Sequence, residues 1–188
     1  MSQVNENFLN KHDEEGGSRR ILKNWNLKLV GFVAITWSLF QLWYASPLPF
    51  LLDFGKFIDV PARAIHLAFG MGLCFLAYPA LKSKRNSPIN IFDFILAFIS
   101  LLATFYLVIE YEGLVYRQGI LATVDLFGFK IPYELILGSL GILLLLEATR
   151  RAIGIPLVTI ALLFLLFSIF GQKMPDLISH QGLSITRL

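Results

Sequence analysis

The feature that most constrains this chain is a series of apolar runs long enough to cross a lipid bilayer. The first covers residues 27–45. An α-helix rises about 1.5 Å per residue, so such a run of about 19 residues matches the roughly 30 Å hydrocarbon core of a bilayer. Further runs cover residues 61–81, 91–109, 131–148 and 155–171. The sequence therefore predicts an all-α fold, a polytopic membrane helix bundle of about five transmembrane helices with short interfacial helices.

Composition supports this class and excludes others. Hydrophobic residues make up 56% of the 188 residues and charged residues 15%, whereas soluble domains have about 45–50% and about 25%. Such a chain has too little polar surface for a soluble enzyme and is too hydrophobic to be disordered. The single cysteine, Cys74, cannot form a disulfide framework. A net charge of +3 gives no reason to expect a nucleic-acid partner.

Polar segments flank and separate the apolar runs. Residues 1–26 are predicted to be a cytoplasmic tail, residues 27–171 the transmembrane domain, and residues 172–188 an extracytoplasmic tail or connector. The first run is no signal peptide, because it is longer than a typical signal sequence and no small-residue cleavage site ends it. The stretch 50–60 is predicted to lie on the membrane surface. Residues 111–130 are too polar to span the membrane and are predicted to form an extramembrane loop with a surface helix.

Orientation follows from the positions of Lys and Arg, which are enriched on the cytoplasmic side of membrane proteins. With the N-terminus inside and five spans, ten of the sixteen fall inside, clustered at helix ends: Lys11, Arg19, Arg20, Lys23, Lys28, Lys82, Lys84, Arg85, Arg150 and Arg151. We therefore expect a multi-pass membrane protein with a cytoplasmic N-terminus and an extracytoplasmic C-terminus.

Charged residues near the ends of the runs are the candidate contacts for a partner or for lipid. Arg63 and His66 are three residues apart and would share a helix face. They bind an anionic headgroup or a partner carboxylate, or line a pathway, or, as we favour, extend to the outer interface. Asp93, two residues inside the third run, suits a helix N-terminus and is assigned a structural role.

The densest charged group follows the fourth run. Glu147 and Arg151 are four residues apart and are expected to pair across one helical turn. Arg150 and Arg151 suit a helix C-terminus. They are predicted to anchor the helix on the cytoplasmic side, to bind lipid phosphate or a partner subunit, or to do both, because anchoring would leave guanidinium donors free. Glu134 and Glu147 must lie near the interfaces or face protein.

No motif for catalysis, metal binding or a cofactor is present. The three histidines, His12, His66 and His180, are far apart, and no phosphate-binding loop or paired-cysteine motif occurs. The middle of each run holds no ionisable side chain other than Tyr106 and Cys74. Transport sites need polar groups near the bilayer midplane, so we expect a non-enzymatic scaffold or partner subunit rather than the pore.

Several short motifs resemble the small membrane subunit of tripartite ATP-independent periplasmic (TRAP) transporters, most closely the fused permeases of the TAXI-associated branch. The similarity covers roughly Trp37 to the C-terminus. Its centre is the string Leu146-Glu147-Ala148-Thr149-Arg150-Arg151 followed by Gly154. The other matching positions are Ile65 to Phe69, Tyr78-Pro79, Tyr111, Arg117, Gly119, Asp125, Phe170-Gly171, Pro175, His180 and Gly182.

This resemblance implies a scaffold in a bacterial cytoplasmic (inner) membrane, with its C-terminus in the periplasm. The scaffold would brace a large membrane subunit and help a periplasmic TAXI-type solute-binding protein to dock. Transport would be symport driven by a sodium or proton gradient, with the coupling-ion and substrate sites in the large subunit. In fused members the segment 182–188 would continue into the large part. Arg117 and Asp125, in the predicted outer loop, become candidate docking residues. Phospholipids are further expected partners.

Two other interpretations remain open. The chain is either a stand-alone membrane protein, namely a small channel or an enzyme with a site assembled around Arg63, His66 and Glu110, or an assembly factor for another membrane complex. Solute flux or turnover by the purified chain would favour the first, and the identity of the recovered partner would distinguish the second.

Overall fold

The structure is a computed structural model that describes residues 19–84, 86–117, 120–126 and 129–171. The helices in order are α2 (Asn24–Ala45), α3 (Leu48–Leu51), α4 (Asp59–Ala77), the short 3-10 helix η1 (Lys82–Lys84), α5 (Ile91–Ile109), α6 (Tyr111–Tyr116), α7 (Tyr133–Ala152) and α8 (Ile155–Phe170). Helices dominate, so the predicted all-α membrane bundle is confirmed. Most of both predicted tails lies outside the described residues.

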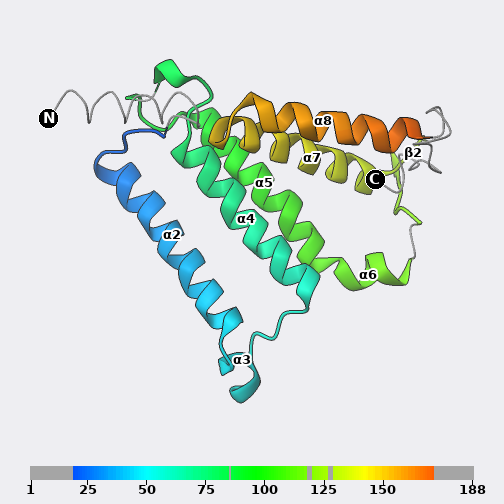
Figure 1. Ribbon diagram of the computed structural model, residues 1–188. Coiled ribbons are helices and arrows are strands. Elements are labelled where there is room, and N and C mark those ends of the chain that lie inside the picture. The colour runs from blue at the N-terminus through cyan, green and yellow to red at the C-terminus, as the bar shows by residue number, and fades with distance from the viewer. Residues whose placement is uncertain (1–18, 85, 118–119, 127–128, 172–188) are drawn as a thin grey trace, which may run out of the picture.

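Three of the described helices, α2, α4 and α5, are long and apolar enough to cross a membrane, and α8 is a shorter apolar helix of 16 residues. Helix α7 has 20 residues but carries Glu134 in its first turn and Arg150 and Arg151 in its last. The expected number of about five spans therefore stays a prediction. Figure 1 shows α2, α4 and α5 with roughly aligned axes and alternating chain direction, with α7 and α8 crossing them at an angle.

Helix α4 is the centre of the fold, because it contacts α2, α5 and α7. Its most extensive contact is with α5. Ala64, Ala68 and Gly72 recur at four-residue spacing on α4 and are buried. Small side chains at this spacing allow close approach of a neighbouring helix. Helix α5 also buries small residues, namely Ala97, Ser100, Ala103 and Thr104. The α4–α5 hairpin is thus the rigid core of the molecule.

Two helix boundaries differ from prediction for identifiable reasons. Helix α4 begins at Asp59, so Pro61 is its third residue rather than its first. The first turn tolerates proline because its amides have no partner within the helix. The same helix ends at Ala77, not at residue 81, because Tyr78 is extended before Pro79, and a residue that precedes proline disfavours helical geometry.

Helix α7 continues four residues beyond the predicted end, through Arg150 and Arg151. It ends where Gly154 takes a φ of +113°, which favours glycine, and Pro156 lies in the first turn of α8. This break lets α8 run back beside α7. Because Arg151 is part of the helix rather than of a loop, its side chain is directed into the fold.

The loop at 111–130 contains the predicted surface helix, α6, but also a short hairpin that was not predicted. Strands β1 (Val124–Leu126) and β2 (Phe129–Ile131) pair antiparallel, with Asp125 opposite Lys130. The pattern of only three residues per strand is too short to be read from sequence. The stretch after α2 likewise holds the short helix α3, and most of its residues are exposed.

Candidate functional site

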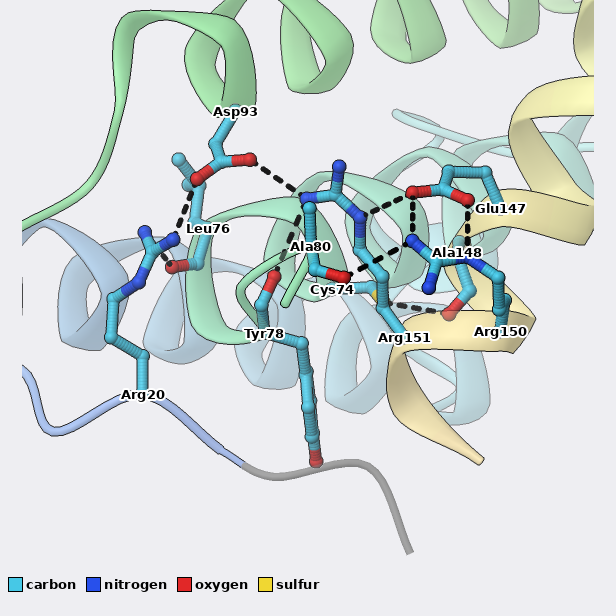
Figure 2. A network of polar contacts seen from close by, with 10 residues as sticks. All are labelled: Arg20, Cys74, Leu76, Tyr78, Ala80, Asp93, Glu147, Ala148, Arg150 and Arg151. Carbon is cyan, nitrogen blue, oxygen red and sulfur yellow. Dashed lines mark hydrogen bonds and ion pairs between the residues drawn. The ribbon is translucent and has the colours of Figure 1, made fainter. Parts of the chain in front are cut away.

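The main polar cluster joins four segments at the end of the bundle where α5 begins. We call it the arginine network, and its members are Arg20, Asp93, Glu147, Arg150 and Arg151 (Figure 2). Its centre is Asp93, in the first turn of α5. One carboxylate oxygen accepts from Arg20 Nη2 at 2.6 Å, and the other accepts from Arg151 Nη1 at 2.7 Å. All three side chains are at most 6% exposed.

The network continues along α7. Arg151 Nε donates to Glu147 Oε1 at 2.8 Å, which confirms the predicted pairing across one turn. Arg150 forms a two-bond pair with the same carboxylate, at 2.7 and 2.8 Å. Such bidentate pairs have well-defined geometry. The side chain of Arg150 is 38% exposed, whereas that of Arg151 is 4% exposed. The two neighbouring arginines therefore differ in their surroundings.

The end of α4 explains why arginines gather here. The last carbonyls of a helix have no partner within it and carry partial negative charge. Arg20 N–H donates to Ala77 O at 2.8 Å, and Arg20 Nη1 lies 3.4 Å from Leu76 O. Arg151 and Arg150 reach Tyr78 O and Ala80 O, just beyond the helix. The arginines thus satisfy carbonyls that would otherwise be unpaired.

Apolar contacts complete this region. The Arg151 guanidinium lies 5.1 Å from the ring centroid of Phe75, which is fully buried, and such a cation–π contact strengthens when water is excluded. Cys74 Sγ donates to Ala148 O at 3.1 Å and links α4 to α7. Because Asp93, Glu147 and the arginines are committed to one another, this part of the network is a structural tie between helices.

A second polar cluster lies near the start of α7, at the other end of α5. We call it the Glu134 network, and it consists of Tyr106, Glu110, Arg117, Ala122 and Glu134. Glu134 is buried and accepts from Tyr106 Oη at 2.8 Å and from the Ala122 amide at 2.7 Å. Arg117 bridges Glu134 and Glu110 at 2.7 and 2.8 Å. Glu134 faces protein, as its place near the end of an apolar run suggested.

Arg63 and His66 lie on α4 but have different partners. Arg63 pairs with Asp59 one turn earlier, at 2.8 Å, and both side chains are largely exposed. His66 Nδ1 lies 2.8 Å from Gln41 Nε2 on α2, and its ring meets that of Trp37 edge-on. Glu110 pairs with Arg117 instead. The contacts that the structure records therefore do not join Arg63, His66 and Glu110 into one site.

Six of the seven candidate contact residues are hydrogen-bonded within the described chain, namely Arg63, His66, Arg117, Glu147, Arg150 and Arg151. Arg63, His66 and Asp125 are exposed. The expectation that anchoring leaves guanidinium donors free is wrong for Nε and Nη1 of Arg151 and for Nε and Nη2 of Arg150. These donors are used inside the fold.

Arg20 is central to this network but was not singled out from sequence, whereas Asp93 was singled out without its partners. Arg20 was assigned to a cytoplasmic tail but is 5% exposed and tied to α4 and α5. Asp93 was assigned a structural role at a helix N-terminus, which agrees with its position, but its arginine partners were not foreseen. The sequence did hold one indication of these partners: Asp93 lies in an apolar run, and a carboxylate in such a run needs a cation.

Comparisons with family models, with curated proteins and with solved structures found no match. Within the described residues, no three His, Cys, Asp or Glu side chains gather as metal ligands would. The functional conclusion must therefore come from the geometry of the chain itself.

Proposed function

We propose that this chain is the small, non-catalytic subunit of a TRAP-type secondary solute importer in a bacterial inner membrane. In this role it braces a large transport subunit and helps a periplasmic TAXI-type solute-binding protein to dock. The sodium or proton site and the solute site would belong to the large subunit. The observation that carries the proposal is that Ser and Thr hydroxyl groups in the middle of the described helices are satisfied by the backbone of their own helix.

This internal pairing is systematic. Hydroxyl groups of Thr36, Ser38, Ser100, Thr104 and Thr159 each donate to a carbonyl three or four residues earlier in the same helix. Such back-bonding satisfies the hydroxyl without leaving a polar group aimed at a neighbouring cavity. A transported polar solute or ion needs convergent polar groups near the bilayer midplane. Within the described helices, the Trp37 indole N–H on α2 is a buried donor without a partner, and a single N–H group does not make a convergent site.

Charged side chains, by contrast, tie helix ends together. The arginine network joins the segment before α2 to α4, α5 and α7. The Glu134 network joins the end of α5 and the loop after it to the start of α7. Helices held at both ends resist sliding past one another, because moving one would separate buried charges. Resistance to relative motion is what a brace for a moving partner requires.

The loop between α5 and α7 suits the docking role. It lies at the end of α5 opposite the basic arginine network, so it would face the periplasm in the orientation that the Lys and Arg distribution favours. Asp125 in strand β1 is exposed. Arg117, in contrast, holds Glu110 and Glu134. Asp125 is therefore the side chain whose charge can change without disturbing the helix contacts.

Co-purification tests the proposal. The tagged chain is co-expressed with a TRAP-type large permease subunit and a TAXI-type solute-binding protein and extracted in mild detergent. We expect the permease to co-elute with the chain, and the variant Asp125→Lys to reduce binding-protein recovery while permease recovery stays unchanged. Asp53→Lys, in the other exposed loop, is the matched control. Elution of the chain without the permease would contradict the scaffold role.

A further inference from the structure

The arginine network contains more positive than negative charge. Three arginines, Arg20, Arg150 and Arg151, share two carboxylates, those of Asp93 and Glu147. Arg20 Nε is buried without a hydrogen-bond partner among the described residues. Figure 2 draws Arg151 Nη2 without a contact to the other residues shown. Arg20, Arg151 and Asp93 are buried, whereas Arg150 and Glu147 are partly exposed, so the buried part of the network holds two cations and one carboxylate. Because buried charge is unfavourable unless it is balanced, this surplus indicates a place for an anion.

A cavity of about 610 Å³ lies beside the network and gives that anion access. Its charged lining residues are Arg20, Arg151, Asp93 and Lys84. Lys84 is exposed and forms no ion pair with the described part of the chain. Three cations and one carboxylate therefore face the cavity. Its volume lies within the roughly 300–1,000 Å³ that is usual for small-ligand sites.

The start of α5 adds donors to the same cavity. The first amides of a helix have no partner within it and favour an anion. Asn90 precedes the helix, lines the cavity and makes no capping bond with its side chain. The amides of Ile91 and Phe92, which follow it, are thus left for a ligand or for water. These amides add to the attraction for an anion that the surplus of buried positive charge creates.

The apolar part of the lining indicates an amphiphile. Leu81, Ile91 and Phe92 line the cavity and are 57%, 65% and 69% exposed. Two of them begin a helix that is apolar enough to span the membrane. An anion that binds here would have hydrocarbon beside it. Basic pockets at the ends of membrane helices are suited to lipid headgroups for the same reason.

We propose that this cavity binds the phosphate group of an anionic phospholipid. The phosphate would pair with Lys84 and with the arginines that line the cavity, Arg20 and Arg151. An acyl chain would follow the exposed apolar side chains at the start of α5. The site would fix a lipid at the end of the bundle where α4, α5 and α7 meet. This inference does not depend on the proposed transporter role, because it uses only this chain.

Lipid retention by the purified full chain in non-ionic detergent tests the site. We expect native mass spectrometry to find phosphatidylglycerol bound more tightly than phosphatidylcholine, whose headgroup has no net charge. Lys84→Gln should weaken phosphatidylglycerol binding about fivefold, as expected for one basic residue near a lipid surface. Lys28→Gln, an exposed lysine on α2 that does not line the cavity, is the matched control and should leave binding unchanged.

A second variant separates binding from folding. Asn90→Asp keeps a favourable residue before the helix but adds a negative charge to the cavity lining. We expect helix content and thermal stability to be retained while phosphatidylglycerol binding falls about fivefold. Equal affinity for the two lipids, or equal losses in Lys84→Gln and Lys28→Gln, would overturn the proposal.

Two further experiments test whether something other than a lipid occupies the cavity. If inorganic phosphate alone binds and displaces phosphatidylglycerol at comparable concentration, the site takes free phosphate and the lipid assignment fails. If phosphatidylglycerol binds only after Asp13, Glu14 and Glu15 are changed to their amides, the chain's own carboxylates occupy the cavity and the proposal fails. Neither result would affect co-purification with a permease, so the two proposals can fail separately.

Discussion

The charged clusters at the two ends of α5 differ in their balance of charge and in their exposure. At its start, Asp93 is buried between Arg20 and Arg151, and the cluster has more arginines than carboxylates. At its end, Arg117 alone bridges Glu110 and Glu134, and its side chain is 28% exposed. The first cluster has a positive surplus around a buried centre, Arg20–Asp93–Arg151. The second has a negative surplus around an arginine that is partly exposed.

This difference shows that basic residues at one side of a membrane protein are not all surface anchors. Counting Lys and Arg treats Arg20, Arg150 and Arg151 alike. The structure separates them, because Arg150 is half-buried while Arg20 and Arg151 are inside the fold. The energetic weight of a charge depends on its burial, since water screens an exposed pair and not a buried one. The free energy of unfolding should therefore depend more on the cluster around Asp93 than on the cluster around Glu134.

The largest effect is expected at Asp93. Asp93→Asn removes the carboxylate between two buried arginines, and loss of one partner from a buried pair costs about 3–5 kcal/mol. Unfolding in mixed detergent micelles, followed by circular dichroism, measures this loss of free energy. The single cysteine, Cys74, reports the same change, because it is buried against Ala148. Maleimide should label it slowly in the wild type and faster in the variant.

Arg150→Gln is the matched control, since it removes a charge from the same network at a half-exposed position. It should leave the Arg20–Asp93–Arg151 contacts intact and Cys74 protected. If Asp93→Asn and Arg150→Gln have equal effects on unfolding and labelling, burial does not determine the strength of this network.

An intermediate effect is expected at Glu134. Glu134→Gln removes its charge but keeps an oxygen that accepts from Tyr106 or Ala122, and Arg117 keeps Glu110. Hydrogen bonds to charged groups contribute about 1.5–3 kcal/mol, so the loss should fall in that range and below that of Asp93→Asn. Glu112→Gln on α6 changes an exposed carboxylate and serves as the control. A larger loss for Glu134→Gln than for Asp93→Asn would reverse the comparison.

The smallest effect is expected for an exposed pair. Arg63 and Asp59 have side chains that are 77% and 61% exposed. Exposed pairs contribute about 0.2–1 kcal/mol. A double-mutant cycle with Arg63→Gln and Asp59→Asn should give a coupling energy in this range. A coupling energy as large as the loss at Asp93 would show that exposure is a poor guide to strength in this protein.

The sequence predicted the positions of the helices well and the polar contacts between them poorly. Apolar runs predicted where α2, α5 and α8 lie, and the spacing of Glu147 and Arg151 predicted their contact. The partners of Asp93 were not predictable, because Arg20 and Arg151 are far from it in the chain and only the packing of α4, α5 and α7 brings them together. The β1–β2 hairpin was missed because its strands are too short to produce an alternating pattern.

The same limit applies to the candidate site residues. Sequence reasoning identified Arg117 and Arg151 as charged residues near the membrane, but exposure and pairing are properties of the fold. A single sequence therefore could not distinguish Asp125, which is exposed, from Arg117, which holds two carboxylates.

The most direct test of the central claim, that these helices support a partner and hold no cargo, is a density map of the chain bound to its permease with solute and coupling ion present. We expect both densities to lie among the helices of the permease, with α2, α4, α5 and α7 contacting neither. Solute or cation density enclosed by these four helices would contradict the account.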